Sequence, residues 1–173
     1  GLHQYFVHKK QTMLESAPLF APCYRCTLKH QLDFFMPFSK LGLSRPITTA
    51  IAEQGYDSPT PIQEQAIPVA LQGKNIIAAA QTGSGKTASF VLPILEQLSQ
   101  SETQRKKRFR ALILTPTREL AVQVNKSIKV YAKHLNLKSL VVYGGVDDKP
   151  QKQKLIEGID ILVATPGRLL DLY

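Results

Sequence analysis

The chain has 173 residues, of which 43% are hydrophobic, and its formal net charge at pH 7 is +9. This length and hydrophobic content indicate one globular domain with its own core. No apolar run approaches the ~20 residues of a membrane-spanning helix, so we expect no membrane association. Two cysteines and no secretory leader predict a cytoplasmic protein. The positive charge is compatible with a polyanionic partner.

Residues 1–35 lack helical and strand periodicity, yet they hold both cysteines. Our hypothesis is that they form an N-terminal extension, either disordered or translated from sequence before a native start at Met36, and that the domain is 36–173. Cys23, Cys26 and His30 could ligate a metal. Zinc sites usually need four ligands, and a second pair at suitable spacing is absent, which favours unpaired cysteines.

The domain opens with two predicted helices. Ser44 is a suitable cap for a helix over 44–54, with Gly55 as its stop. A second helix is predicted over 60–73, and Pro68 should kink it.

From residue 75 onward, strand-like and helix-like segments alternate. Strands are predicted at 75–80, 111–115, 139–143 and 159–164, each followed by a helix, at 86–99, 118–134, 148–157 and 166–172. This order predicts an α/β fold with a parallel, doubly wound sheet and helices on both faces. Arg105 to Arg108, with Arg110, form a basic cluster before the second strand, for which a solvated loop is favoured over a nucleic-acid contact.

Residues 80–87 read Ala-Gln-Thr-Gly-Ser-Gly-Lys-Thr and lie between the first strand and its helix. A strand–loop–helix setting with this pattern is typical of a phosphate-binding loop. Gly83 and Gly85 let backbone N–H groups converge on phosphate oxygens, at a helix start whose dipole favours anions. Lys86 would reach the β- and γ-phosphates, and the Thr87 hydroxyl would bind Mg²⁺.

The other three strands end in sequences that also suit phosphate. Strand ends of a parallel sheet share one edge, where ligands bind. A single nucleotide cannot use every one of these junctions, so we expect a second, extended ligand: a nucleic-acid backbone. The residues concerned are Pro116, Thr117, Arg118, Glu119, Gly144, Gly145, Thr165, Pro166, Gly167 and Arg168. The alternative for each junction is ordinary helix capping, which is the favoured interpretation of residues 165–168 when they are taken alone.

Gln63 has two interpretations at this stage. With Thr60 it fits a capping box, in which the glutamine side chain returns to the backbone of the cap residue. Alternatively, its amide could pair with N6 and N7 of adenine. The local pattern alone favours the cap.

These motifs together resemble those of the DEAD-box RNA helicases of superfamily 2. Residues 55–63 resemble the family's Q motif, residues 80–87 its motif I (Ala80 included), residues 116–120 motif Ia, residues 144–145 the GG pair and residues 165–168 motif Ib. The sequence around them is most similar to the bacterial RhlE subgroup.

The resemblance implies a RecA-like P-loop NTPase domain that binds ATP and Mg²⁺. It implies that Lys86 and Thr87 are catalytic, that Gln63 selects adenine, and that Phe38 and Tyr56 help form the adenine pocket. The remaining expected nucleotide contacts are Ala80, Gln81, Thr82, Gly83, Ser84 and Gly85. Motifs Ia, GG and Ib would hold RNA by its backbone with little sequence preference, and the full-length parent would unwind short RNA duplexes.

Two parts that the resemblance implies do not occur in the 173 residues: the Asp-Glu-Ala-Asp motif and the second RecA-like domain. We therefore expect a C-terminally truncated domain that hydrolyses ATP poorly, with uncovered strand edges and marginal stability. The alternatives are a short non-catalytic nucleotide- or RNA-binding module and a small kinase. The sequence is silent on oligomeric state and on the RNA substrate.

Overall fold

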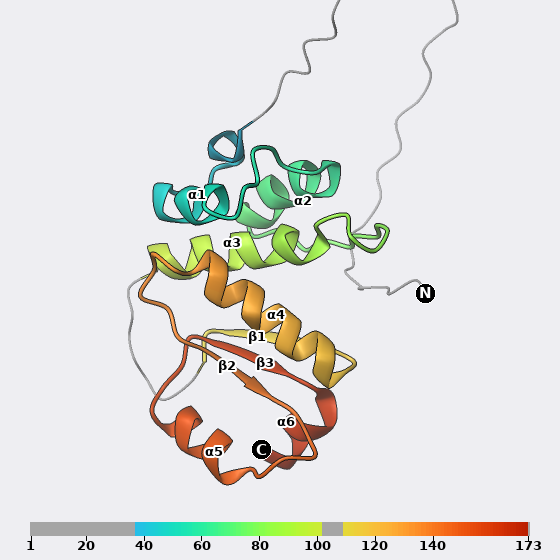
Figure 1. Ribbon diagram of the computed structural model, residues 1–173, viewed down its shortest axis with the longest axis vertical. Coiled ribbons are helices and arrows are strands. Elements are labelled where there is room, and N and C mark those ends of the chain that lie inside the picture. The colour runs from blue at the N-terminus through green and yellow to red at the C-terminus, as the bar shows by residue number, and fades with distance from the viewer. Residues whose placement is uncertain (1–36, 102–108, 173) are drawn as a thin grey trace, which may run out of the picture.

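The computed structural model describes residues 37–101 and 109–172 (Figure 1). Its sheet contains β1 (Ala111–Leu114), β2 (Ser139–Val142) and β3 (Ile161–Ala164) in the order β1-β3-β2. Both pairings are parallel, with Ala111 and Ser139 on either side of Ile161. The expected parallel α/β architecture is confirmed, and each described strand is followed by a helix.

The helices lie close to their expected positions. They are the 3-10 helix η1 (Phe38–Leu41), α1 (Arg45–Ala52), α2 (Pro61–Leu71), α3 (Lys86–Gln100), α4 (Arg118–Tyr131), α5 (Lys149–Ile156) and α6 (Pro166–Leu172). The helix α2 continues through Pro68 as one element.

Helices cover both faces of the sheet, as expected (Figure 1). Along β3, Ile161 and Val163 face the main core, which α1, α3 and α4 complete. The alternate residues Leu162 and Ala164 face a smaller cluster with side chains from α5 and α6. All of β3 is buried, as the central strand of a doubly wound sheet should be.

The segment 75–80 is not a strand in this structure, so that prediction is wrong here. Ile77 is 54% exposed, and on β1 Leu112 and Leu114 are exposed as well. A strand exists only where a neighbour completes its ladder. Within the described residues β1 pairs with β3 alone, and no neighbour lies along 75–80.

Ser44 occupies the cap position of α1, but its hydroxyl makes no cap hydrogen bond. Its Oγ is buried and has no partner among the described residues. Instead, the Ser44 N–H donates to Glu96 Oε2 at 2.8 Å. The predicted position is therefore right and the predicted capping bond is wrong, because a carboxylate from α3 engages this residue through its backbone.

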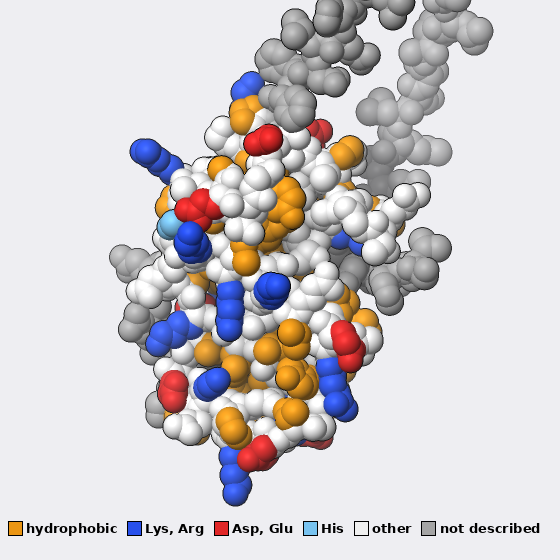
Figure 2. Space-filling view, viewed as in Figure 1, with side chains coloured by type: hydrophobic (Ala, Val, Ile, Leu, Met, Phe, Trp, Pro, Cys, Tyr) orange, Lys and Arg blue, Asp and Glu red, His pale blue; other side chains and the backbone are white. Residues whose placement is uncertain are grey.

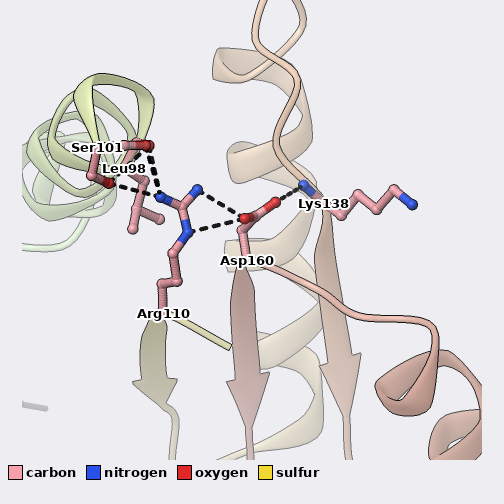
Figure 3. A network of polar contacts seen from close by, with 5 residues as sticks. All are labelled: Leu98, Ser101, Arg110, Lys138 and Asp160. Atoms are coloured by element: carbon pink, nitrogen blue, oxygen red, sulfur yellow. Dashed lines mark hydrogen bonds and ion pairs between the residues drawn. The ribbon is translucent and has the colours of Figure 1, made fainter. Parts of the chain in front are cut away.

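Arg110 anchors the amino end of the sheet (Figure 3). Its Nε and Nη2 donate to Asp160 Oδ1 at 3.0 and 2.8 Å, and its Nη1 donates to the Leu98 carbonyl at 2.9 Å. Asp160 Oδ2 accepts from the Lys138 N–H at 2.8 Å. Arg110 thus joins α3 to the starts of all three strands and belongs to the structure of the domain. Residues 105–108 lie outside the described part of the chain.

None of the helices among the described residues is long and apolar enough to cross a membrane. The same residues contain no cluster of side chains suited to a metal ion. Cys23, Cys26 and His30 fall outside them, as do residues 1–35 as a whole, so the hypotheses on the N-terminal segment stay as they were.

Candidate functional site

The glycines of the predicted phosphate-binding loop adopt an unusual backbone conformation. Gly83 and Gly85 adopt φ values of +84° and +85°, a left-handed conformation that glycine tolerates far better than other residues. Gly85 is also the N-cap residue of the 15-residue helix α3. The first N–H groups of this helix have no partner within it, so the loop presents donors and a positive dipole end to an anion.

Lys86 lies against its own loop in this structure. Its Nζ donates to the carbonyl oxygen of Gln81 at 2.5 Å and to that of Ala80. Ser84 Oγ, in the same loop, is buried and has no hydrogen-bond partner among the described residues. A buried hydroxyl without a partner is costly. The loop therefore combines a cation, free donors and an unsatisfied hydroxyl.

Gln63 forms the cap and also contacts the phosphate loop. Its Oε1 accepts from the Thr60 N–H at 2.9 Å, and its Nε2 donates to the Gly85 carbonyl at 3.2 Å. Thr60 Oγ1 donates to the Ser84 carbonyl at 2.8 Å. A Cβ atom on Gly85 would lie 2.4 Å from Gln63 Nε2. Residue 85 must be glycine for α2 and the loop to approach in this way, and adenine recognition by Gln63 stays a prediction.

The two aromatic residues expected at the adenine pocket differ in exposure. Phe38 is buried in the main core, whereas Tyr56 is 55% exposed. The Tyr56 hydroxyl lies near Tyr131, the last residue of α4. Burial raises the pKa of Tyr131, and the neighbouring Tyr56 adds to this increase. Their roles toward adenine remain predictions.

The three described strand ends meet in one groove of about 470 Å³. Its lining combines residues from the turns after β1, β2 and β3: Pro116, Thr117, Arg118, Glu119, Gly144, Thr165, Gly167, Arg168 and Asp171. The parallel topology thus brings together most of the expected backbone-binding residues, which are distant in the sequence; Gly145 and Pro166 are not part of the lining. Asp171 was not expected here; its position one helical turn after Arg168 is the signal that could have indicated it.

Arg118 lies directly on the glycine pair. A Cβ atom built on Gly145 would be 2.5 Å from Arg118 Nη1, and Gly145 has φ +80°. Thr117 Oγ1 accepts from the Leu120 N–H at 3.2 Å and so caps α4. The capping interpretation of this junction is therefore correct, and the same cap places Arg118 at the groove.

Arg168 is held by the loop that follows β2. Its Nη2 donates to the Val146 carbonyl at 2.7 Å, and its Nε donates to Gln151 Oε1 at 3.3 Å. Gln151 was not among the expected site residues. It is the buried residue of α5, a helix whose other side chains are mainly polar, and a pattern with a buried glutamine is hard to recognise without the fold.

Residues 60–173 match the sequence model of the DEAD/DEAH box helicases. The chain belongs to this family. It is 46% identical over 134 residues to the DEAD-box ATP-dependent RNA helicase RhpA of Helicobacter pylori. The aligned residues cover 78% of this chain and 26% of RhpA. It is 47% identical, also over 134 residues, to the probable ATP-dependent RNA helicase ddx27 of Dictyostelium discoideum, covering 78% of this chain and 17% of that protein.

The fold of this DEAD/DEAH box helicase chain also matches solved structures. The crystal structure of the RNA-helicase Prp28 from Chaetomium thermophilum bound to ADP has a TM-score of 0.72 and 43% identity, over 78% of this chain and 33% of that one. The RecA-like fold is thereby confirmed. The chain spans only 17–27% of the length of these and similar curated relatives. The similarities to helicases do not favour a short non-catalytic module or a small kinase.

Proposed function

We propose that this chain is the ATP-binding and RNA-backbone-binding part of an ATP-dependent RNA helicase, and that the whole protein separates short RNA duplexes with ATP hydrolysis. The observation that carries the proposal is the groove in which motifs Ia, GG and Ib meet. In the same chain, residues 80–87 form the predicted phosphate-binding loop at the start of α3. The names of the relatives support it, as does ADP bound to the similar Prp28.

The loop residues fit an ATP phosphate chain. Ser84 Oγ has no partner among the described residues, and Lys86 supplies the cation. Thr87 follows in the first turn of α3 and offers its hydroxyl to Mg²⁺. Bound ATP supplies the phosphoanhydride bond. Lys86 would first exchange the Ala80 and Gln81 carbonyls for phosphate oxygens, which makes nucleotide binding a local rearrangement of this loop.

The groove fits an RNA backbone better than base edges. It offers two guanidinium groups, Arg118 and Arg168, and the backbone of Gly144, all of which suit phosphate and sugar. Figure 2 shows Lys and Arg side chains scattered over the face that α4 covers, without one dominant patch. Such a distribution favours binding without sequence readout.

We further propose four finer assignments. The sequence around the motifs supports the RhlE-like bacterial subgroup, and the low cysteine content supports a cytoplasmic location. The greater length of the relatives supports two further parts in the natural protein: the Asp-Glu-Ala-Asp motif, which would belong to this same domain, and a second RecA-like domain, which would close on this one. ATP and Mg²⁺ would be the cofactors of the complete enzyme.

RNA-stimulated ATP hydrolysis by the natural full-length protein tests the proposed function. We expect Lys86→Ala to lower the ATPase rate by at least ~100-fold, because positioning and charge stabilisation supply most of phosphoryl-transfer catalysis. Lys154→Ala, an exposed lysine on α5, is the control and should leave the rate unchanged. ATPase activity that does not respond to RNA would contradict the proposal.

A further inference from the structure

Gln151 lies where the loop after β2 meets motif Ib. It is 9% exposed, and its Nε2 donates to the carbonyls of Tyr143 and Asp147, both at 3.4 Å. Its Oε1 accepts from Arg168 Nε at 3.3 Å. One side chain therefore contacts both ends of the loop that carries the glycine pair, and also the arginine on the other side of the groove.

The chemistry of this position requires an amide. An amide accepts hydrogen bonds through its oxygen and donates two through its nitrogen, and Gln151 uses both functions. A carboxylate would set negative charge against two carbonyl oxygens, and an apolar side chain would lose all three contacts. Burying an amide to pack a peripheral helix would be unfavourable without such partners. The burial of this glutamine is therefore explained by what it holds.

We propose that Gln151 is a positioning residue of the RNA-binding groove: it holds Arg168 and the loop 143–147 in one arrangement, and in this way sets the affinity for an RNA backbone. The inference rests on the proposed function. Among the described residues no hydrogen bond uses Arg168 Nη1, and Arg168 lines the groove, so this part of the guanidinium can meet a phosphate while Nε and Nη2 stay held.

The advantage is one of preorganisation. A free arginine loses side-chain entropy when it binds a phosphate, and this loss weakens binding. Gln151 and the Val146 carbonyl have already ordered Arg168. The same amide orders the backbone around Gly144 and Gly145, so the loss of one side chain should weaken two contacts with RNA.

The test is the affinity of the full-length protein for a fluorescein-labelled single-stranded RNA of mixed sequence, with a non-hydrolysable ATP analogue present. We expect Gln151→Met to weaken RNA binding on the order of tenfold. Gln153→Met, the same change at an exposed position of α5, should leave it unchanged. Binding of the ATP analogue, measured without RNA, should be equal in all three proteins.

A double-mutant cycle separates positioning from general structural damage. In an Arg168→Ala background, Gln151→Met should weaken RNA binding by a clearly smaller factor, because one of its two targets is gone. If Gln151→Met lowers the melting temperature, Gln151→Glu, which keeps the acceptor for Arg168 and loses the two donors, provides a second variant with the same expected loss of RNA binding.

Equal factors in both backgrounds, or normal RNA binding by Gln151→Met, would overturn this inference and leave the proposed function intact. Absence of RNA binding by the unsubstituted protein would overturn the proposed function, and the inference with it.

Discussion

The two ends of the same sheet use arginine in opposite ways. At the amino end, Arg110 is satisfied by Asp160, by a helix carbonyl and by Ser101 Oγ at 2.7 Å (Figure 3). At the carboxyl end, Arg118 and Arg168 line an open groove. All three side chains are positively charged. The Arg110 guanidinium uses Nε, Nη1 and Nη2 in hydrogen bonds within the fold, whereas the two guanidinium groups at the carboxyl end retain N–H groups that can bind a ligand.

This contrast shows why a basic cluster in the sequence is weak evidence for nucleic-acid binding. Arg110 follows a run of basic residues, yet its partner is a carboxylate from a strand 50 positions later. Arg118 stands beside Glu119, with no basic run around it, and lies in the groove. The location of an arginine at a strand's carboxyl end is the better predictor, because that edge of a parallel sheet is where ligands bind.

The largest expected effect is on stability, at the amino end. Asp160→Ala should reduce the free energy of unfolding by about 2–3 kcal/mol, because it leaves a half-buried guanidinium and the Lys138 N–H without their acceptor. Urea unfolding followed by circular dichroism measures it. Asp57→Ala, at an exposed aspartate, should stay within about 0.5 kcal/mol of the unsubstituted protein. Equal losses of unfolding free energy in the two variants would show that the contact between Arg110 and Asp160 does not stabilise the domain.

At the carboxyl end, Gly145→Ala should weaken RNA binding by roughly tenfold, since a Cβ there would displace the Arg118 guanidinium. The positive φ adds strain of about 1 kcal/mol. Gly158→Ala is a matched control: Gly158 has φ +84° and nothing within 4 Å of the added Cβ. Both variants should lose similar stability, and Gly145→Ala alone should lose RNA affinity. Loss of affinity in both would assign the effect to strain.

Arg118→Ala should have a smaller effect, because it removes one phosphate contact and leaves the glycine backbone in place. The slope of log affinity against log salt concentration should fall by about 0.7, the value for one phosphate of a single strand. Filter binding over a salt series measures the slope. Arg45→Ala, an exposed arginine on α1, is the control and should not change it. An unchanged slope for Arg118→Ala would show that this side chain does not contact phosphate.

The smallest expected effect concerns an exposed ion pair between the ends of α1 and α4. Glu53 accepts from Lys133 Nζ at 2.6 Å and contacts His134 Nε2 at 2.9 Å. These contacts, Lys133 first, lower the pKa of Glu53 below its usual 4.5. A lowered pKa stabilises the fold above pH 4.5, and this contribution is lost as the pH falls through the folded value.

Melting temperatures between pH 3 and pH 7 test this linkage. Glu53→Gln should melt slightly below the unsubstituted protein at neutral pH and at the same temperature at pH 3. A difference that is constant across the pH range would show that the ion pair does not carry the effect.

Much of the fold was predictable because its signals are local. Caps, glycine stops and apolar periodicity placed α3, α4 and α6 to within a few residues. The meeting of motifs Ia, GG and Ib also followed from the sequence, since strand ends of a parallel sheet must share an edge.

What failed or was missed depends on partners distant in the sequence. The segment 75–80 has strand composition, but a ladder needs a neighbour, and none lies beside it among the described residues. Gln63 could have been a cap or a base reader; the structure shows the cap and adds a bond to Gly85 that no local pattern contains.

The sequence by itself therefore determined the family, the order of helices and strands, and the edge of the sheet at which ligands would bind, because motifs and periodicity depend on near neighbours. Only the tertiary structure decided which polar side chains are already engaged. In this structure Arg110 binds Asp160, whereas Arg118 lines the groove. Gln151 accepts a hydrogen bond from Arg168. A hydrogen bond depends on distance and direction in space, and these are set by packing between segments that the sequence keeps apart.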